Sequence, residues 1–155
     1  MTETSKLTIW IDSDACPKPI KEVIYRASHR LQLPVILVAN SYMSVPPGTL
    51  IRSIQVDKGA DVADQYINDH CDIKDIVVTQ DIPLAALIVA KGAVAINPRG
   101  ELYTEDNISE RLAMRDFMKE LRDSGTVTGG PAPFNAKDVE QFANSLNKIL
   151  TKLVK

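Results

Sequence analysis

Cysteine, histidine and aromatic residues are all scarce in this sequence. It has two cysteines and two histidines among 155 residues, and only 5% of the residues are aromatic. Cys16 and Cys71 lie far apart without metal-ligand spacing, so we expect two free thiols rather than a disulfide framework or a zinc site. Cys16 precedes an expected helix, where a thiolate could be stabilised, but the nearby Asp12 and Asp14 oppose a second negative charge. No Ser-His-Asp or Cys-His arrangement for acyl transfer is present.

Long apolar runs and a strong net charge are also missing. The longest apolar stretch, 84–90, is far shorter than the ~20 residues that span a membrane. Residues 1–6 are polar and lack the apolar core of a signal peptide. We therefore expect a cytoplasmic protein with no membrane contact. The formal net charge of -2 gives no global field for a polyanion, which would need a local basic patch or a metal ion.

Apolar runs that resemble strands alternate with patterns that are typical of helices. Strands apolar on both faces, alternating with helices, indicate a mostly parallel sheet of about five strands with helices on both faces, a three-layer α/β fold. With 45% apolar residues, the chain can bury one continuous core, so we expect a single domain over residues 1–155. The expected strands are 7–11, 35–39, 50–56, 76–79 and 93–96, and the expected helices between them begin near residues 17, 60 and 81.

The last third of the chain has a different character. We expect residues 104–155 to be a helical portion packed on the rest of the domain, with a first helix over 104–122. The segment 125–133 is rich in glycine and proline, and it is expected to connect two helices or to cover a site. Asn135 is expected to cap the last helix, which carries one apolar stripe.

Five aspartates fall where expected strands end or the following helices begin. They are Asp12 and Asp14 after the first strand, Asp61 and Asp64 after the third, and Asp81 after the fourth. The carboxyl ends of parallel strands form the functional crevice of an open α/β sheet, so these side chains are expected to converge. Clustered carboxylates repel one another unless protons or a cation offset the charge, and hard oxygen ligands suit Mg²⁺ or Mn²⁺. The sequence therefore predicts a divalent-metal site of these five acids, with Asp12, Asp14 and Asp81 also as catalytic candidates.

Each acid also has a simpler interpretation. Aspartate is common as a cap and in the first turn of helices, and Asp81 alone would be such a cap. Three further residues are candidates for substrate binding. Asn40 can hydrogen-bond a ligand after the second strand or can simply belong to a turn, while Arg99 and Arg115 can hold a phosphate or can be solvated surface charges. The scarcity of aromatic residues offers no evident platform for stacking bases.

Several short strings together resemble the YaiI/YqxD family, and they follow one another over nearly the whole chain. They are 11–17 (IDSDACP), 38–40 (VAN), 59–64 (GADVAD), 79–85 (TQDIPLA), 97–100 (NPRG), 114–117 (MRDF) and 129–131 (GGP).

This resemblance implies a bacterial cytosolic protein of undefined function with a fold similar to the PIN nuclease domain. PIN-like nucleases use acids at strand ends to hold Mg²⁺ or Mn²⁺ for RNA cleavage, and Asp12, Asp61 or Asp64, and Asp81 match that layout. The first string usually reads Asp-Ala-Asp in the family, and Ser13 is a departure that leaves both acids intact. Activity inferred from a shared fold is an analogy.

Three functions compete at this stage, and the oligomeric state is open. The first is a metal-dependent nuclease that acts on RNA or DNA, with RNA favoured over DNA. The second is an aspartate-nucleophile phosphatase using Asp12 and Asp14, although the later lysine and acidic pair expected of that superfamily are not evident, and Cys16 stands where it has Thr or Val. The third is a non-catalytic module that binds a metal ion or a nucleic acid.

Overall fold

The computed structural model describes residues 7–59, 61–125 and 134–153. Its strands are β1 (Ile9–Asp12), β2 (Val35–Ala39), β3 (Ile51–Gln55), β4 (Ile76–Val78), β5 (Val94–Ile96) and β6 (Leu102–Tyr103). Its helices are the short 3₁₀ helix η1 (Ser13–Ala15), α1 (Lys18–Leu31), α2 (Val62–His70), α3 (Ile82–Lys91), α4 (Glu105–Asp123) and α5 (Ala136–Leu153). The predicted alternation of strands and helices is confirmed.

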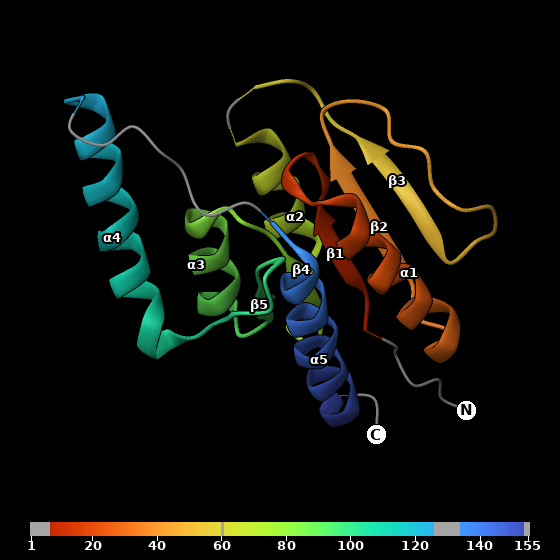
Figure 1. Cartoon of the computed structure of the whole chain (residues 1–155). Coiled ribbons are helices and arrows are strands. Elements are labelled where there is room, and N and C mark those ends of the chain that lie inside the picture. The colour runs from red at the N-terminus through yellow and green to blue at the C-terminus, as the bar shows by residue number, and fades with distance from the viewer. Residues whose placement is uncertain (1–6, 60, 126–133, 154–155) are drawn as a thin grey trace.

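These strands form one six-stranded sheet in the order β3-β2-β1-β4-β5-β6. The first five strands of this order pair in parallel, whereas β6 is antiparallel to β5. Figure 1 shows the arrowheads of β1, β2 and β3 pointing to the same edge. The carboxyl ends of the parallel strands therefore meet there, as the sequence predicted.

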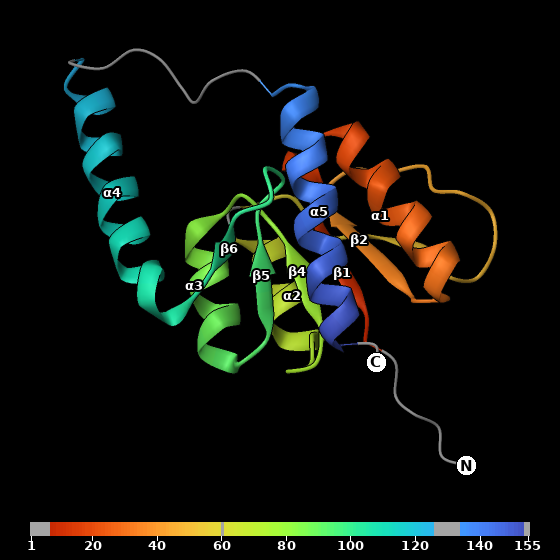
Figure 2. The same ribbon diagram turned by 60° about the horizontal axis from the view of Figure 1, so that its bottom comes forward.

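Helices cover both faces of the sheet, which gives three layers. Ile9 and Ile11 of β1 belong to a core shared with α1 and α5, while Trp10 faces a second core shared with α2 and α3. Figure 2 shows α1 and α5 in front of the sheet and α2 behind it. Because successive side chains of a strand point to opposite faces, a strand covered on both sides must be apolar throughout. This is why β1, β2 and β4 could be recognised in the sequence.

The two edge strands are less regular. β3 was expected over 50–56, but the structure buries only Ile51 of its five residues fully, and Arg52 and Gln55 are exposed. The sequence did not predict β6, which has only two residues. It follows a turn in which the Gly100 amide donates to the Asn97 carbonyl at 2.9 Å. A two-residue strand has too little pattern to be distinguished from a loop.

The turn before β6 anchors α5. Gly100 has a φ of 90°, and a Cβ atom at this position would lie 2.7 Å from the Gln141 carbonyl oxygen of α5. Ser145 of α5 donates its hydroxyl to the Gly100 carbonyl at 2.7 Å. Asn135 caps α5 as predicted, because its side chain accepts a hydrogen bond from the Asp138 amide at 3.1 Å. These contacts place α5 across the sheet, where Phe142 is completely buried.

The two C-terminal helices are confirmed, but they differ in how they pack. α4 begins with a capping box formed by Thr104 and Asn107, and none of its residues is buried. In both ribbon views it stands beside α3, away from the sheet (Figures 1 and 2). Of the connection expected over 125–133, all but Gly125 lies outside the described residues. No helix in the described ranges has the length and apolar character needed to cross a membrane.

Candidate functional site

The order in which strands are added to the sheet reverses between the neighbouring strands β1 and β4. From β1 the order continues outward through β2 to β3, and from β4 it continues the other way to β5. Open α/β sheets bind ligands in the crevice at such a switch point. A pocket of about 470 Å³ lies there, and all five predicted acids border it. It is lined by Asp12, Asp14, Asn40, Gly59, Asp61, Ala63, Asp64, Gln80 and Asp81. We call it the aspartate pocket.

Asp12 is the most buried of the five acids, with 8% of its surface exposed. It is the last residue of β1, and pairing of Ile11 with Val78 brings it next to Thr79, which follows β4. The Thr79 hydroxyl donates to Asp12 Oδ2 at 2.8 Å. Burial raises the pKa of Asp12, the Thr79 hydrogen bond opposes that rise, and the charges of Asp81 and Asp14 add to it.

Asp14 and Asn40 join the ends of β1 and β2. Asp14 lies in the η1 turn, is exposed, and accepts a hydrogen bond from the Asn40 backbone amide at 3.0 Å. Asn40 therefore holds Asp14 through its main chain, while the residue itself borders the pocket. The sequence predicted that Asn40 binds a ligand or belongs to a turn; the structure shows its main-chain amide bonded to Asp14, and ligand binding by its side chain stays a prediction.

Asp81 caps α3, as the sequence predicted. Its Oδ1 atom accepts a hydrogen bond from the Leu84 amide at 2.9 Å, and its own amide donates to the Thr79 hydroxyl at 2.9 Å. Asp61 precedes α2 with a left-handed φ of 67°, and its side chain makes no capping hydrogen bond. Positive φ is uncommon outside glycine, although aspartate tolerates it better than most residues. Asp61 is thus held in a less favourable conformation at the rim of the pocket.

Asp64 shows how strongly the acids interact. Its pKa is raised to about 7, first by burial, then by the charge of Asp81 and a hydrogen bond between the two side chains, and further by Asp12 and Asp61. A carboxyl group with this pKa is a mixture of protonated and charged forms near neutral pH. The aspartate pocket therefore holds more negative charge than it can easily accommodate.

The acids surround the pocket without closing into a cage. In the ranges that the structure describes, no three Asp, Glu, His or Cys side chains form a group that could hold a metal ion. Two of the acids each accept a hydrogen bond from a main-chain amide with one carboxylate oxygen. Asp14 accepts from Asn40, and Asp81 accepts from Leu84. A cation at this position would contact fewer protein oxygens than the five-acid prediction implies.

Comparison with known proteins agrees with the strings in the sequence. Residues 10–152 match the family described as uncharacterized, YaiI/YqxD. The chain belongs to this family. It is 57% identical to a UPF0178 protein of Shewanella baltica over 96% of this chain and 99% of that protein. Similar proteins come from Trichlorobacter lovleyi, with 57% identity over 96% and 97% of the two chains, and Geobacter metallireducens, with 56% identity over 96% of each. No solved structure matches the chain.

The two arginines that were predicted to bind substrate do not border the aspartate pocket of this family member. Arg99 pairs with Asp138 of α5 at 2.7 Å and lies 5.7 Å from the centre of the Phe134 ring. Arg115 lies on α4 and contacts the neighbouring Asp116 at 2.9 Å. Arg99 thus contributes to the anchoring of α5, and Arg115 belongs to the surface of α4.

Ser13 and Cys16 flank the acids without joining them. The Ser13 hydroxyl is buried and has no hydrogen-bond partner among the described residues. An alanine would lose no hydrogen bond to the described residues at such a position. Burial raises the pKa of Cys16 to about 12, although Lys21 opposes this shift, so Cys16 stays a thiol near neutral pH and the idea of a stabilised thiolate is wrong. Cys16 and Cys71 are both free, as predicted.

Two buried acids with structural roles were missed in the sequence. Asp75 accepts hydrogen bonds from the Thr8 amide, the Asp72 amide and the Trp10 indole at 2.8–3.0 Å. Asp138 accepts from Arg99 and from the Asn135 amide. Their donors come from distant segments, and nothing local distinguishes these acids from exposed ones. Asp12 differs from both, because the Thr79 hydroxyl is the single donor that the described residues give to its carboxylate.

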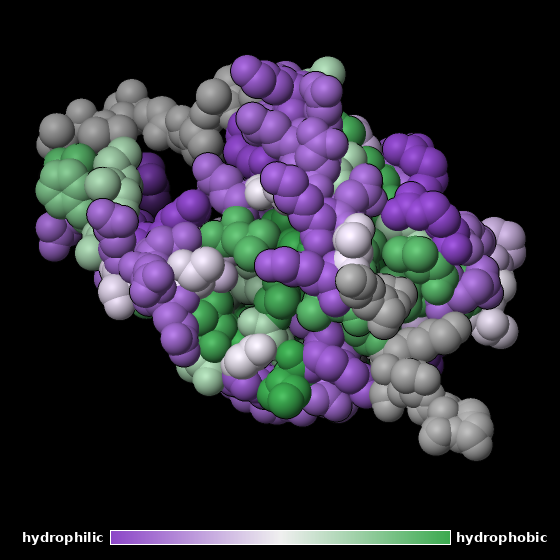
Figure 3. All heavy atoms as spheres, turned by 90° about the horizontal axis from the view of Figure 1, so that it is seen from below, coloured by the Kyte–Doolittle hydropathy of each residue, from purple (hydrophilic) through white to green (hydrophobic). Residues whose placement is uncertain are grey.

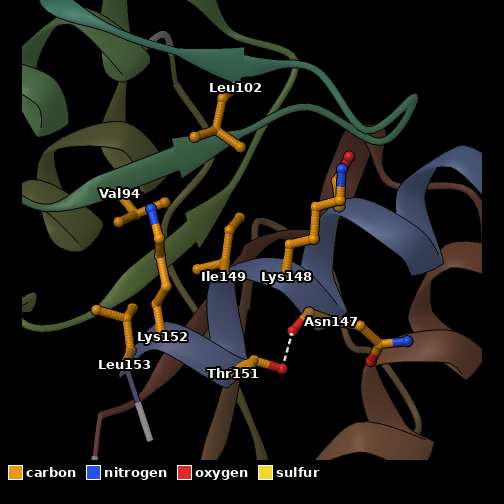
Figure 4. Close-up of a pocket in the computed structure, with 9 residues that line it drawn as sticks. Val94, Leu102, Asn147, Lys148, Ile149, Thr151, Lys152 and Leu153 are labelled. Atoms are coloured by element: carbon orange, nitrogen blue, oxygen red, sulfur yellow. Dashed lines mark hydrogen bonds between the residues drawn. The ribbon is translucent and has the colours of Figure 1, made fainter. Parts of the chain in front are cut away.

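A larger, apolar pocket lies elsewhere and contains none of the predicted site residues. It has a volume of about 670 Å³ and is formed by α5 with β5 and β6. Figure 4 shows Val94, Leu102 and Ile149 around it and the long side chains of Lys148 and Lys152 beside it. Apolar side chains also show between the hydrophilic helices when the molecule is seen from below (Figure 3). This pocket shares no residue with the aspartate pocket.

Proposed function

We propose that this chain is a divalent-metal-dependent nuclease that hydrolyses phosphodiester bonds at the aspartate pocket, with RNA favoured over DNA as the substrate. The observation that carries the proposal is the gathering of five carboxylates, from three separate connections, around one pocket at the switch point of the sheet. Burial, together with the neighbouring carboxylates, raises the pKa of Asp64 to about 7. A bound cation would remove the repulsion between the carboxylates.

The donor set fits Mg²⁺ or Mn²⁺ better than other metals. All five acids offer hard oxygen atoms, and the pocket has neither the thiolates nor the imidazoles that favour zinc or copper. Mg²⁺ commonly keeps several waters and binds through one or two carboxylates together with substrate phosphates, so a closed group of three acids is not required. Asp12, with Asp14 or Asp81, would hold such an ion. Once bound, it would activate water and offset charge on the phosphate.

The remaining acids would position groups and move protons. Asp64 has a pKa of about 7, and a group with a pKa near the working pH is best suited to accept a proton from an attacking water or to donate one to a leaving oxygen. Thr79 orients Asp12 through the hydrogen bond to Oδ2, and this bond favours the charged carboxylate against the opposing effect of burial. Asp61 would add negative charge at the rim.

A binding module without catalysis is the second candidate. It is favoured by one observation: the described acids do not form a ready ligand group of three, which is expected of a weak cation site. The resemblance to PIN-like nucleases supports the enzyme instead, by analogy of fold. The two candidates make different predictions for the same purified protein, since only the enzyme cleaves a substrate.

The test is cleavage of labelled single-stranded RNA and DNA by purified protein with Mn²⁺. We expect Mn²⁺-dependent cleavage of RNA by the wild-type protein and its loss in Asp12→Asn, which retains the oxygen that accepts from Thr79. Ser13→Ala is the matched control, because this neighbouring hydroxyl has no partner among the described residues. Cleavage that persists in Asp12→Asn, prepared in the same way, would sink the assignment of this pocket.

Calorimetric titration with Mn²⁺ separates the two candidates further. Because a cation would displace the proton that Asp64 holds near neutral pH, binding is expected to release protons at about pH 7 and to release fewer in Asp64→Asn. Metal binding without cleavage supports the binding module. If neither Mn²⁺ nor Mg²⁺ binds, both candidates lose their common basis.

A further inference from the structure

Another pocket is lined by more basic than acidic side chains, in contrast to the aspartate pocket. It has a volume of about 670 Å³ and lies between α1 and the loop that follows β2. Both walls start at the acids, since α1 begins four residues after Asp14 and the loop begins at Asn40, whose amide contacts Asp14. We call it the α1 groove. It is lined by Lys18, Lys21, Glu22, Tyr25, Arg26, His29, Ser44, Val45 and Pro46.

The α1 groove is a cationic surface. Its lining contains three basic side chains, Lys18, Lys21 and Arg26, and one carboxylate, that of Glu22. None of the three cations has an ion-pair partner within the described part of the chain, whereas Arg99 is paired there with a carboxylate. The Lys21 ammonium group instead contacts the Met43 sulfur in the loop that follows β2. Three unpaired cations in one groove suit a ligand that carries several negative charges.

Helix geometry places these cations in a row. The lining residues of α1 recur at intervals of three and four, which puts them on one face, while the other face buries residues such as Ile20 and Ile24 in the core. From Lys18 to Arg26 the row is about 12 Å long at the ~1.5 Å rise per residue of an α-helix. A chain of phosphates could follow such a row.

An exposed aromatic ring lies in the chain between the two pockets. Tyr42 is 77% exposed, more than any other large apolar side chain in the described ranges. It stands two residues beyond Asn40, which borders the aspartate pocket, and two before Ser44, which borders the α1 groove. Proteins that hold single-stranded nucleic acid combine a cationic groove with exposed aromatic rings on which unpaired bases stack, and Tyr42 lies within two residues of the groove in the sequence. The scarcity of aromatics had concealed this in the sequence.

We propose that single-stranded nucleic acid binds along the α1 groove, with phosphates on Lys18, Lys21 and Arg26 and a base stacked on Tyr42. The inference rests on the proposed nuclease function and names its substrate class. The strand would continue past Asn40 and bring a phosphodiester to the aspartate pocket. The cations are needed because the acids alone repel a polyanion. A duplex is disfavoured, because the faces of its paired bases are not accessible to Tyr42.

Binding can be measured without cleavage, by fluorescence anisotropy of a short labelled oligouridylate in EDTA. The triple variant Lys18→Gln/Lys21→Gln/Arg26→Gln is expected to bind at least 10-fold more weakly at about 0.1 M salt, with the slope of log affinity against log salt smaller by about 2. Tyr42→Ala is expected to lose about 5- to 150-fold, and Tyr42→Phe to bind like the wild type. Glutamine replaces Lys18, Lys21 and Arg26 because it retains a high helix propensity.

The matched control removes three positive charges elsewhere. In Lys119→Gln/Lys148→Gln/Lys152→Gln the net charge changes by the same amount, on α4 and α5, and binding is expected to stay close to that of the wild type. Equal losses in the two triple variants would show a general charge effect and overturn the proposal. The proposal would also be overturned if a duplex bound the wild-type protein as tightly as the single strand, or if the single strand did not bind at low salt.

Failure of this inference can be distinguished from failure of the nuclease proposal. If the wild type binds through the α1 groove but cleaves nothing with Mn²⁺, the groove stands and the nuclease function falls. If cleavage depends on Asp12 but is undiminished in the α1 triple variant and in Tyr42→Ala, the nuclease function stands and the groove falls. Circular dichroism of each variant, all made at surface positions, checks that the fold is retained.

Discussion

Replacement of Asp64 by asparagine should stabilise the protein at alkaline pH. The pKa of Asp64 is raised from 3.8 to about 7, so the fold disfavours its charged form. Below the pKa of the unfolded state, Asp64 is protonated in both the folded and the unfolded state, so its ionisation does not lower the free energy of unfolding. As the pH rises from the unfolded pKa to the folded pKa, the unfolded state releases its proton more readily than the folded state, so the wild type loses free energy of unfolding, and the loss is complete above the folded pKa. Asparagine stays neutral and can still donate a hydrogen bond to Asp81.

The magnitude follows from the size of the shift. A shift from 3.8 to about 7 would be worth about 4 kcal/mol at ~1.4 kcal/mol per pKa unit. Asp64 is only partly buried, so solvent screens its interactions and we expect about 1–2 kcal/mol. The gain of Asp64→Asn over the wild type should be near zero at about pH 4 and should reach this plateau above about pH 7.

Urea denaturation in EDTA at about pH 4.5, 6 and 8 measures this difference in the free energy of unfolding. Asp69→Asn is the control, because Asp69 is an exposed acid on the same helix whose carboxylate accepts a hydrogen bond from the Gln65 side chain. The reasoning is refuted if Asp64→Asn has the same effect at all three pH values, or if it is less stable than the wild type at pH 8. Added Mn²⁺ should reduce the gain, since a cation relieves the same repulsion.

Three further substitutions test the surroundings of the site by the same denaturation assay. Thr79→Val removes the donor to the buried Asp12 and is expected to cost about 1–3 kcal/mol, with Thr79→Ser close to the wild type; equal losses would contradict the role of the hydroxyl. Ser13→Ala removes a buried hydroxyl without a partner among the described residues and should be neutral or stabilising by up to about 1 kcal/mol, and a clear loss would reveal a partner. Gly100→Ala places a Cβ 2.7 Å from the Gln141 carbonyl oxygen, at a φ of 90°, and should cost about 2 kcal/mol or more; a neutral result would mean that α5 shifts easily.

The central strands and the meeting of the acids could be predicted because both follow from local patterns. The run from Val35 to Ala39 is apolar at every position, and the structure buries all five residues in a strand with these bounds. Once the strands are parallel, residues that follow them must meet at one edge, and Asp12 and Asp81 do. Even the cap of α3 by Asp81 could be predicted from residue type and position.

Features that depend on distant partners could not be predicted. Arg99 was a reasonable phosphate ligand until the structure placed Asp138 of α5 against it, about forty residues later in the chain. The structural role of Asp75 depends on donors in the segment before β1. The α1 groove needs both α1 and a loop whose path no periodicity specifies, so Tyr42 had no recognisable role.

The fold itself does not require the crowding of acids in the aspartate pocket. Where this chain buries a carboxylate for structural reasons, it surrounds it with donors, three for Asp75 and an arginine with an amide for Asp138. Asp12 is buried to a similar degree, yet the described residues give it one hydroxyl and two neighbouring acids that raise its pKa. Unfavourable electrostatics that packing does not explain are typical of functional sites, where the charge has a use. The same chain places three cations, which have no ion-pair partner among the described residues, on α1, the helix that follows Asp12 and Asp14 in the sequence. Separate regions of opposite charge at one edge of the sheet are expected of a protein that holds both a cation and a polyanion, and neither region alone would favour that conclusion.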